Sequence, residues 1–163
     1  MSVQDWSHEQ RLTVELRKAL RSAGQAGAPT DFAALPPVEH PKGLSVGSAE
    51  HLCALVRNRN GRLFCFTSES VYVEAEAGFR RLRYNSLQSL DWISEEESFA
   101  KKVALKREFG DRLILRSLGG ERYELDELGW AFQALFNFFV WAVRKNEGTI
   151  RGEQGWVGTL SDE

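Results

Sequence analysis

Residues 61–73 of this 163-residue chain, GRLFCFTSESVYV, decide its fold. The apolar run at 62–67 predicts a buried strand, and residues 71–73 predict a second strand after a short polar turn. The Asn-Gly pair at 60–61 is a strong turn signal, so the apolar residues 51–57 are expected to form the other arm of a hairpin. Connections this short join antiparallel strands, because parallel strands need a long crossover.

The same rhythm of short strands continues through most of the chain. Apolar stretches between turn signals predict further strands at residues 79–84, 87–93, 103–109, 112–116 and 123–125. In the third of these stretches, apolar and polar side chains alternate with the period of two that a strand requires. The pattern predicts an α+β fold, mainly antiparallel β, with about seven strands in a meander.

After residue 125 the apolar period changes to that of a helix, which we expect over residues 126–146. Asp126 is the expected N-cap residue, and the basic residues 144–145 complement the helix dipole in the last turn. Gly148 belongs to the stop signal that follows. One apolar stripe of this helix is expected to close the sheet.

A second apolar stripe on this helix contains Trp130, Phe138 and Trp141. The two tryptophans share a face, because eleven residues are close to three helical turns. A helix that is apolar on nearly every side is normally buried on both faces. The N-terminal helix, a second protein chain or a membrane surface could cover this face, so the three aromatic residues are candidates for a partner interface.

The N-terminal segment also predicts a helix. Ser7 and Gln10 have the spacing of a capping box, and Leu12, Leu16 and Leu20 recur at helical spacing behind them. We expect the helix at about residues 7–22, with a stop near the glycines that follow. Its apolar stripe needs a surface to pack on.

Composition divides the chain into four parts. All four prolines fall in one segment, which predicts an irregular connector with Phe32 and Leu35 attaching it to the domain. The division is an N-terminal helix at 1–24, the connector at 25–48, a β-rich domain at 49–147 and a tail at 148–163.

Three features of the domain resemble bacterial pleckstrin-homology-like (PH-like and GRAM-like) domains. The stretch 61–73 is similar to their second and third strands, and YNSLQSL at 84–90 is similar to the segment that turns into their next strand. The helix after Leu125 lies where such domains place their closing helix. The resemblance, over about residues 49–147, implies a bent sheet or partly open barrel capped by the C-terminal helix. It implies no single function, because this scaffold carries lipid, peptide and protein partners.

Charge and hydropathy narrow the function classes. Lys and Arg number 21 against 23 Asp and Glu, so a net charge of −2 gives no general reason to bind nucleic acid. The start of the chain lacks the features of a secretory signal, and no apolar stretch reaches the length of a membrane span. We therefore expect a cytoplasmic protein.

The cysteines and histidines show no zinc-ligand spacing in the sequence. Cys53 and Cys65 lie on adjacent predicted strands. We expect both to be buried free thiols in a reducing compartment, and a disulfide bond between them is the alternative. No nucleophile motif, orienting carboxylate or phosphate loop accompanies the histidines. We therefore expect no metal, no cofactor and no enzymatic activity.

Three arginines, Arg57, Arg59 and Arg62, surround the first hairpin. In some PH domains this hairpin binds phosphoinositide head groups, so the resemblance makes these residues candidates for binding a lipid or another anion. The alternative is a solvated strand face, because charged residues on strand faces are usually in contact with water alone.

The main hypothesis is a non-enzymatic PH-like binding module that acts through protein–protein interaction, as an adaptor or partner-masking protein. It would present a sheet edge or the aromatic helix face to another protein or to a second copy of itself. The alternatives are an immunity protein that neutralises a toxin and a peripheral module that binds phosphoinositides or other anionic lipids.

Overall fold

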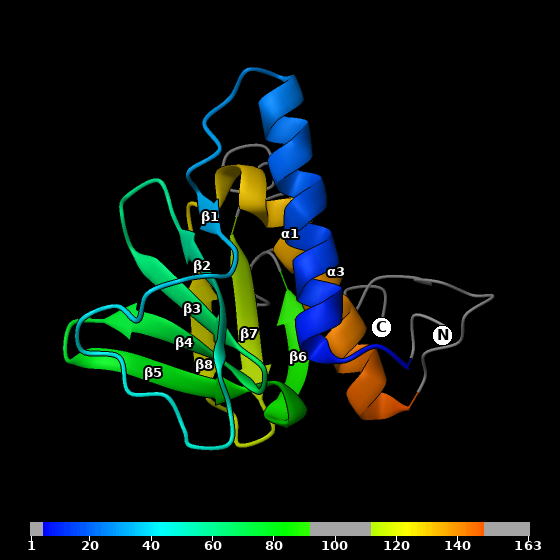
Figure 1. Cartoon of the computed structure of the whole chain (residues 1–163). Coiled ribbons are helices and arrows are strands. Elements are labelled where there is room, and N and C mark those ends of the chain that lie inside the picture. Colours follow the sequence, from blue (N-terminus) through cyan, green and yellow to red (C-terminus); the bar gives the residue numbers. More distant parts are fainter. Residues whose placement is uncertain (1–4, 92–111, 149–163) are drawn as a thin grey trace, which may run out of the picture.

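The computed structural model describes residues 5–91 and 112–148 (Figure 1). Within these residues the fold is α+β, with eight antiparallel strands in two sheets and two α-helices, which confirms the predicted class. The two sheets do not join into a closed barrel in this part of the chain. The strand expected at 103–109 and the tail from residue 149 onward lie outside the described residues.

The larger sheet contains the stretch that opened the sequence argument. Its strands lie side by side in chain order: β1 (Ala33–Ala34), β2 (Leu52–Arg57), β3 (Leu63–Thr67), β4 (Ser70–Ala75) and β5 (Gly78–Arg83). Every residue of β3 is buried, as expected for a central strand. The hairpin predicted between β2 and β3 is confirmed, and Gly61 has the left-handed φ of 86° that this turn requires.

The smaller sheet follows a short 3-10 turn, η2 (Tyr84–Ser86). Its strands are β6 (Leu87–Asp91), β7 (Leu113–Ser117) and β8 (Arg122–Leu125), again in chain order. The Tyr84 hydroxyl donates to the Thr67 carbonyl at 2.8 Å, which ties η2 to the end of β3. The chain therefore passes from one sheet to the other around a fully buried tyrosine.

The N-terminal helix, α1 (His8–Gln25), begins as predicted. Ser7 and Gln10 form the capping box, with Gln10 N donating to Ser7 Oγ at 3.1 Å and Ser7 N donating to Gln10 Oε1 at 2.8 Å. The helix continues three residues beyond the expected end at residue 22.

The C-terminal helix, α3 (Phe132–Glu147), begins later than the sequence predicted. A 3-10 turn, η3 (Gly129–Ala131), precedes it, and Asp126 is not its N-cap. Positive φ angles of 51° at Glu127 and 56° at Gly129 interrupt the chain before η3, so a continuous helix cannot start at Asp126. The predicted end is confirmed, because Gly148 adopts the left-handed conformation of a C-cap.

The second apolar face of α3 is covered by α1 of the same chain (Figure 1). Leu12 and Leu16 of α1 are fully buried in the core that also contains the aromatic residues of α3. Polar contacts fix the pair, with Asn137 Nδ2 donating to Glu15 Oε1 at 3.2 Å and Lys145 Nζ donating to the Trp6 carbonyl at 2.7 Å. The sequence left three candidates to cover this face: the N-terminal helix, a second protein chain and a membrane surface. In the structure it is the N-terminal helix, α1, that covers it.

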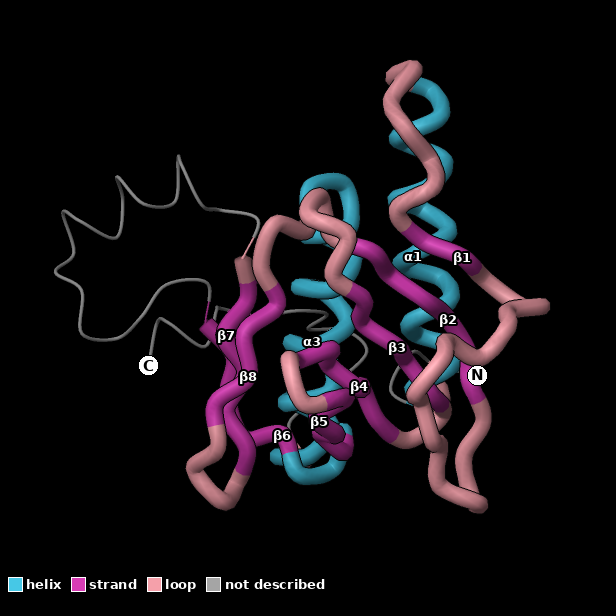
Figure 2. Tube along the Cα trace, turned by 90° about the vertical axis from the view of Figure 1, so that its left-hand side faces the viewer, coloured by secondary structure: helices cyan, strands magenta, loops and turns pink. Residues whose placement is uncertain are grey.

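The main core lies where the two sheets and the two helices meet, and α3 crosses this region (Figure 2). A second, smaller cluster lies on the outer face of the larger sheet, with Cys65 and Tyr72 at its centre. Val38 and Leu44 of the connector pack on this cluster. The connector was expected to be irregular; it also contributes β1 and covers an apolar sheet face.

Glu50 anchors the end of the connector to the sheet. Its side chain is 1% exposed and accepts hydrogen bonds from the Tyr72 hydroxyl at 2.6 Å, from the Thr67 hydroxyl at 3.1 Å and from Arg81. Burial raises the pKa of this carboxyl, but the Tyr72 hydrogen bond and Arg81 outweigh burial and hold the pKa below its usual value. Glu50 therefore remains charged inside a satisfied polar network.

The two cysteines are buried and unbridged. Cys65 belongs to the outer cluster, whereas Cys53 lies near Glu9 of α1. Burial raises the pKa of both thiols to about 12, so both are protonated at neutral pH.

His8, the first residue of α1, packs into an aromatic group at the helix interface. Its ring stacks on Tyr84 with centroids 4.8 Å apart and meets Trp141 edge-on at 5.3 Å. Burial and the nearby Lys145 ammonium lower the pKa of His8 to about 4. The imidazole is therefore neutral at pH 7.

We expect the stability of the protein to fall as the pH decreases from 6.5 towards 4. The unfolded chain binds a proton at His8 near pH 6.5, but the folded chain does so only near pH 4. The free energy of unfolding should therefore be about 1–2 kcal/mol smaller at pH 5 than at pH 7. Urea titrations of wild type, His8→Phe and the exposed-site control His40→Gln would test this. An undiminished pH dependence in His8→Phe would contradict it.

Candidate functional site

A surface pocket of about 740 Å³ lies between the connector, the first hairpin and η3. Its apolar walls include Phe32, Trp130 and Phe132, and its polar lining includes Arg57 and Arg59. The pocket therefore brings together residues from the two candidate sets of the sequence, the aromatic helix face and the basic hairpin.

The floor of the pocket is built by docking the first hairpin onto the segment between β8 and η3. Asn58 Nδ2 donates to the Asp126 carbonyl at 3.1 Å, and the Arg59 amide donates to the Glu127 carbonyl at 3.0 Å. Gly129, with its positive φ, then reverses the chain and brings Trp130 to the surface, where it is 43% exposed.

Arg62 holds the two sheets together below the pocket. Its Nε donates to the Glu74 carbonyl of β4 at 2.8 Å, and its Nη1 donates to the Glu124 carbonyl of β8 at 3.2 Å. The same Nη1 pairs with Asp126 Oδ1 at 3.0 Å. These contacts make Arg62 a structural residue, and they explain why Asp126 is unavailable as a helix cap.

We expect Arg62→Ala to lower the free energy of unfolding by about 2–3 kcal/mol, because two carbonyl groups and a carboxylate lose their donor. Arg83→Ala, on the exposed surface of β5, is the matched control and should change stability by less than about 0.5 kcal/mol. Equal effects of the two substitutions, measured by urea unfolding, would show that Arg62 does not tie the sheets together.

The other two hairpin arginines lie at the pocket. Arg59 pairs with Glu127, and Arg57 is exposed. Within the described residues, the Arg57 side chain donates one long hydrogen bond, from Nη1 to the Gly61 carbonyl at 3.4 Å. The hairpin set is thus divided: Arg62 ties the sheets, Arg59 is neutralised by a carboxylate, and Arg57 has no carboxylate partner within the described residues.

The aromatic set is divided as well. Phe138 is fully buried and Trp141 is 5% exposed, so both belong to the core between α1 and α3 and not to a partner interface. This corrects the sequence-based assignment on two points: α1 covers Phe138 and Trp141, and Trp130 lies in η3, before α3 begins, and not on the same continuous helix as Trp141. Trp130 is exposed and remains a candidate.

We expect Phe138→Ala to destabilise the protein by about 3–5 kcal/mol, because it leaves a cavity in a closely packed aromatic core. Trp130→Ala should cost less than half as much, since much of its ring is already in water. Thermal and urea unfolding of both variants measures the difference. If Trp130→Ala were the more damaging variant, Trp130 would be a core residue.

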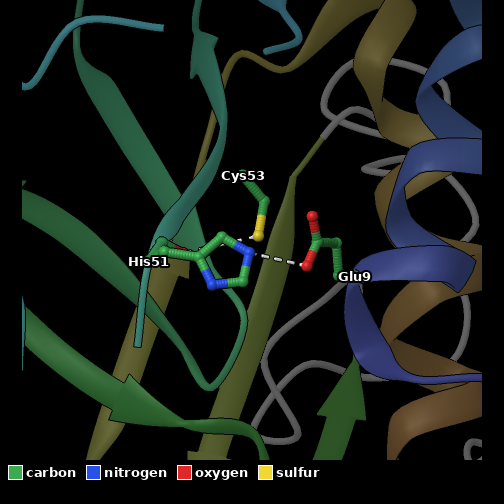
Figure 3. Close-up of side chains that lie close together, drawn as sticks. All are labelled: Glu9, His51 and Cys53. Atoms are coloured by element: carbon green, nitrogen blue, oxygen red, sulfur yellow. Dashed lines mark hydrogen bonds and ion pairs between the residues drawn. The ribbon is translucent and has the colours of Figure 1, made fainter. Parts of the chain in front are cut away.

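A second group of potential ligand side chains lies at the other end of β2. Figure 3 shows Glu9 of α1 facing His51 and Cys53, and the potential ligand atoms of the three residues all lie within 4.8 Å of one another. The sequence showed no metal-ligand spacing among its histidines and cysteines, and nothing in it joined Glu9 to them. No local signal could have found Glu9, because 42 residues separate it from His51.

Comparisons of the chain with protein-family models, curated proteins and solved structures gave no match. The resemblance to PH-like domains therefore stays a prediction. Among the described helices, none combines the length and the apolar character needed to cross a membrane.

Proposed function

We propose that this chain is a non-enzymatic protein-binding module whose pocket beside Trp130 receives an apolar side chain of a partner protein. The observation that carries the proposal is the exposure of Trp130 in a pocket that also contains Phe32, Phe132 and Arg57. Tryptophan, phenylalanine and arginine are the residue types enriched at protein interfaces. Tryptophan and arginine also dominate the residues that contribute most to binding energy.

The polar lining indicates what should flank that apolar side chain. Arg57 offers donors to a carboxylate or a backbone carbonyl of the partner, and Asp31 and Gln133 offer further polar groups. The partner we propose is therefore a protein segment with an aromatic or aliphatic anchor next to an acidic residue. An adaptor, a partner-masking protein and an immunity protein that neutralises a toxin are specific forms of this function.

The charges around the hairpin favour a protein partner over an anionic lipid. Asp126 pairs with Arg62 and Glu127 pairs with Arg59, so only Arg57 of the three arginines has no carboxylate partner within the described residues. A head group with several phosphates usually requires several uncompensated cations. Lipid binding through this hairpin is the weaker alternative.

The thiols and His8 support a non-enzymatic function. Raised pKa values of about 12 keep Cys53 and Cys65 in the weakly nucleophilic thiol form. The low pKa of His8 reflects its place in the aromatic core and leaves it poorly placed for proton transfer to a substrate.

Selection from a displayed peptide library tests the proposal. We expect the full chain to select peptides with an apolar anchor beside an acidic residue. Fluorescence polarisation should show binding at least tenfold weaker for Trp130→Ala and for Arg57→Ala. Leu118→Ala is the matched control, because Leu118 is also an exposed large apolar residue (68%) but does not line the pocket, and it should bind like wild type.

Two outcomes would overturn the proposal. One is peptide binding that is equally strong in the Trp130→Ala variant. The other is salt-sensitive flotation with phosphoinositide vesicles that Arg57→Glu abolishes, in the absence of any selected peptide; this result would favour the lipid alternative.

A further inference from the structure

Glu9, His51 and Cys53 offer three different metal-ligand types at one point of the surface (Figure 3). His51 Nε2 lies 2.8 Å from Glu9 Oε1, and Cys53 Sγ lies 3.4 Å from the His51 carbonyl oxygen. The His51 side chain is 65% exposed and that of Glu9 is 37% exposed, whereas Cys53 is fully buried. The group therefore has a buried sulfur at its base and an opening to solvent above it.

The backbone around these residues is already fixed. Glu9 is in the first turn of α1, which the Ser7–Gln10 capping box holds in place. The His51 amide donates to Ser68 Oγ at 3.1 Å, and the Ser68 amide donates to the His51 carbonyl at 2.9 Å. Helix α1, strand β2 and the two hydrogen bonds between His51 and Ser68 thus hold the ligand atoms in position, as a preorganised site requires.

A β-bulge directs Cys53 towards this group. Leu52 pairs with Thr67 and Ala54 pairs with Phe66, so Cys53 is the extra residue between two consecutive pairs of β2 and β3. Bulges redirect a side chain out of the regular alternation and are frequent beside functional sites. Cys53 accordingly lies next to Glu9 and belongs to neither apolar cluster.

We propose that Glu9, His51 and Cys53 bind a zinc ion, with a water molecule as the fourth ligand. A thiolate, an imidazole and a carboxylate together suit Zn²⁺, whereas Mg²⁺ and Ca²⁺ prefer oxygen ligands alone. The thiolate and the carboxylate carry two negative charges, which the divalent ion neutralises. Ligand atoms this close need only small side-chain rotations to reach tetrahedral positions.

Binding exchanges protons for the metal. The S–H bond of Cys53 breaks, a sulfur–zinc bond forms, and the thiol proton passes to solvent. At His51 the metal takes the place of the Nε2 contact with Glu9, so the ring must carry its proton on Nδ1. The carboxylate of Glu9 then binds zinc in place of the imidazole.

The role that this site would serve is a clamp between α1 and the larger sheet. Glu9 belongs to α1, Cys53 belongs to β2 and His51 directly precedes β2, so a bound ion would cross-link elements that are far apart in the sequence. An ion that binds only the folded chain stabilises it by mass action. The clamp lies at the opposite end of β2 from the Trp130 pocket and does not depend on the proposed function.

Cobalt absorption and zinc calorimetry on the full, tag-free chain test the proposal. With Co²⁺ we expect a thiolate-to-metal charge-transfer band and the visible bands of four-coordinate cobalt, and with Zn²⁺ one equivalent bound and a higher melting temperature. Cys53→Ser should abolish the charge-transfer band. His51→Ala and Glu9→Gln, which alter exposed side chains and should leave the fold intact, should each weaken zinc binding at least about tenfold.

The remaining cysteine and another exposed histidine supply matched controls. Cys65→Ser and His40→Ala should keep the charge-transfer band, the stoichiometry and the rise in melting temperature. The proposal is overturned if wild type gives no charge-transfer band, if Cys65→Ser removes the band while Cys53→Ser keeps it, or if His51→Ala and Glu9→Gln bind zinc like wild type.

Discussion

The attachment of the first hairpin to Asp126 is the constraint on which the rest of the structure depends. Asn58 is 5% exposed and holds the Asp126 carbonyl, while Arg62 spans from β4 to β8 and pairs with the Asp126 carboxylate. The Arg62 side chain is only 33% exposed, so much of its guanidinium group must find acceptors in the protein, and here they come from both sheets. The same contacts join the two sheets and engage the carboxylate of Asp126, which does not cap α3.

Signals that act within a few residues predicted their elements well. The capping box at Ser7, the Asn-Gly turn before β3 and the glycine stop of α3 all appear where the sequence placed them, because each satisfies backbone groups of its own neighbours. Asp126 shows why features that depend on contacts between distant residues could not be predicted. Its local context is that of a helix cap, but a residue 64 positions earlier supplies a stronger charged partner.

The distinction between local signals and tertiary contacts also applies to the Trp130 pocket and to the group of Glu9, His51 and Cys53. Composition and helical spacing drew attention to Trp130 and Arg57, yet they grouped Trp130 with residues that α1 buries and grouped Arg57 with an arginine that the sheets require. Periodicity shows which residues share a face but not which element covers that face. Glu9 joins His51 and Cys53 only through tertiary packing, so no spacing rule could have predicted the group.

The edges of the larger sheet have a consequence for aggregation and for the way a partner can attach. At one edge β1 is only two residues long, and at the other β5 carries Arg80, Arg81 and Arg83. Tyr123 also donates to the Arg81 carbonyl, which occupies part of the β5 backbone. Short, charged or occupied edges discourage another chain from adding a strand. Both edges of the larger sheet are thereby protected from edge-to-edge association, and the partner proposed above would bind through side chains and not by adding a strand to this sheet.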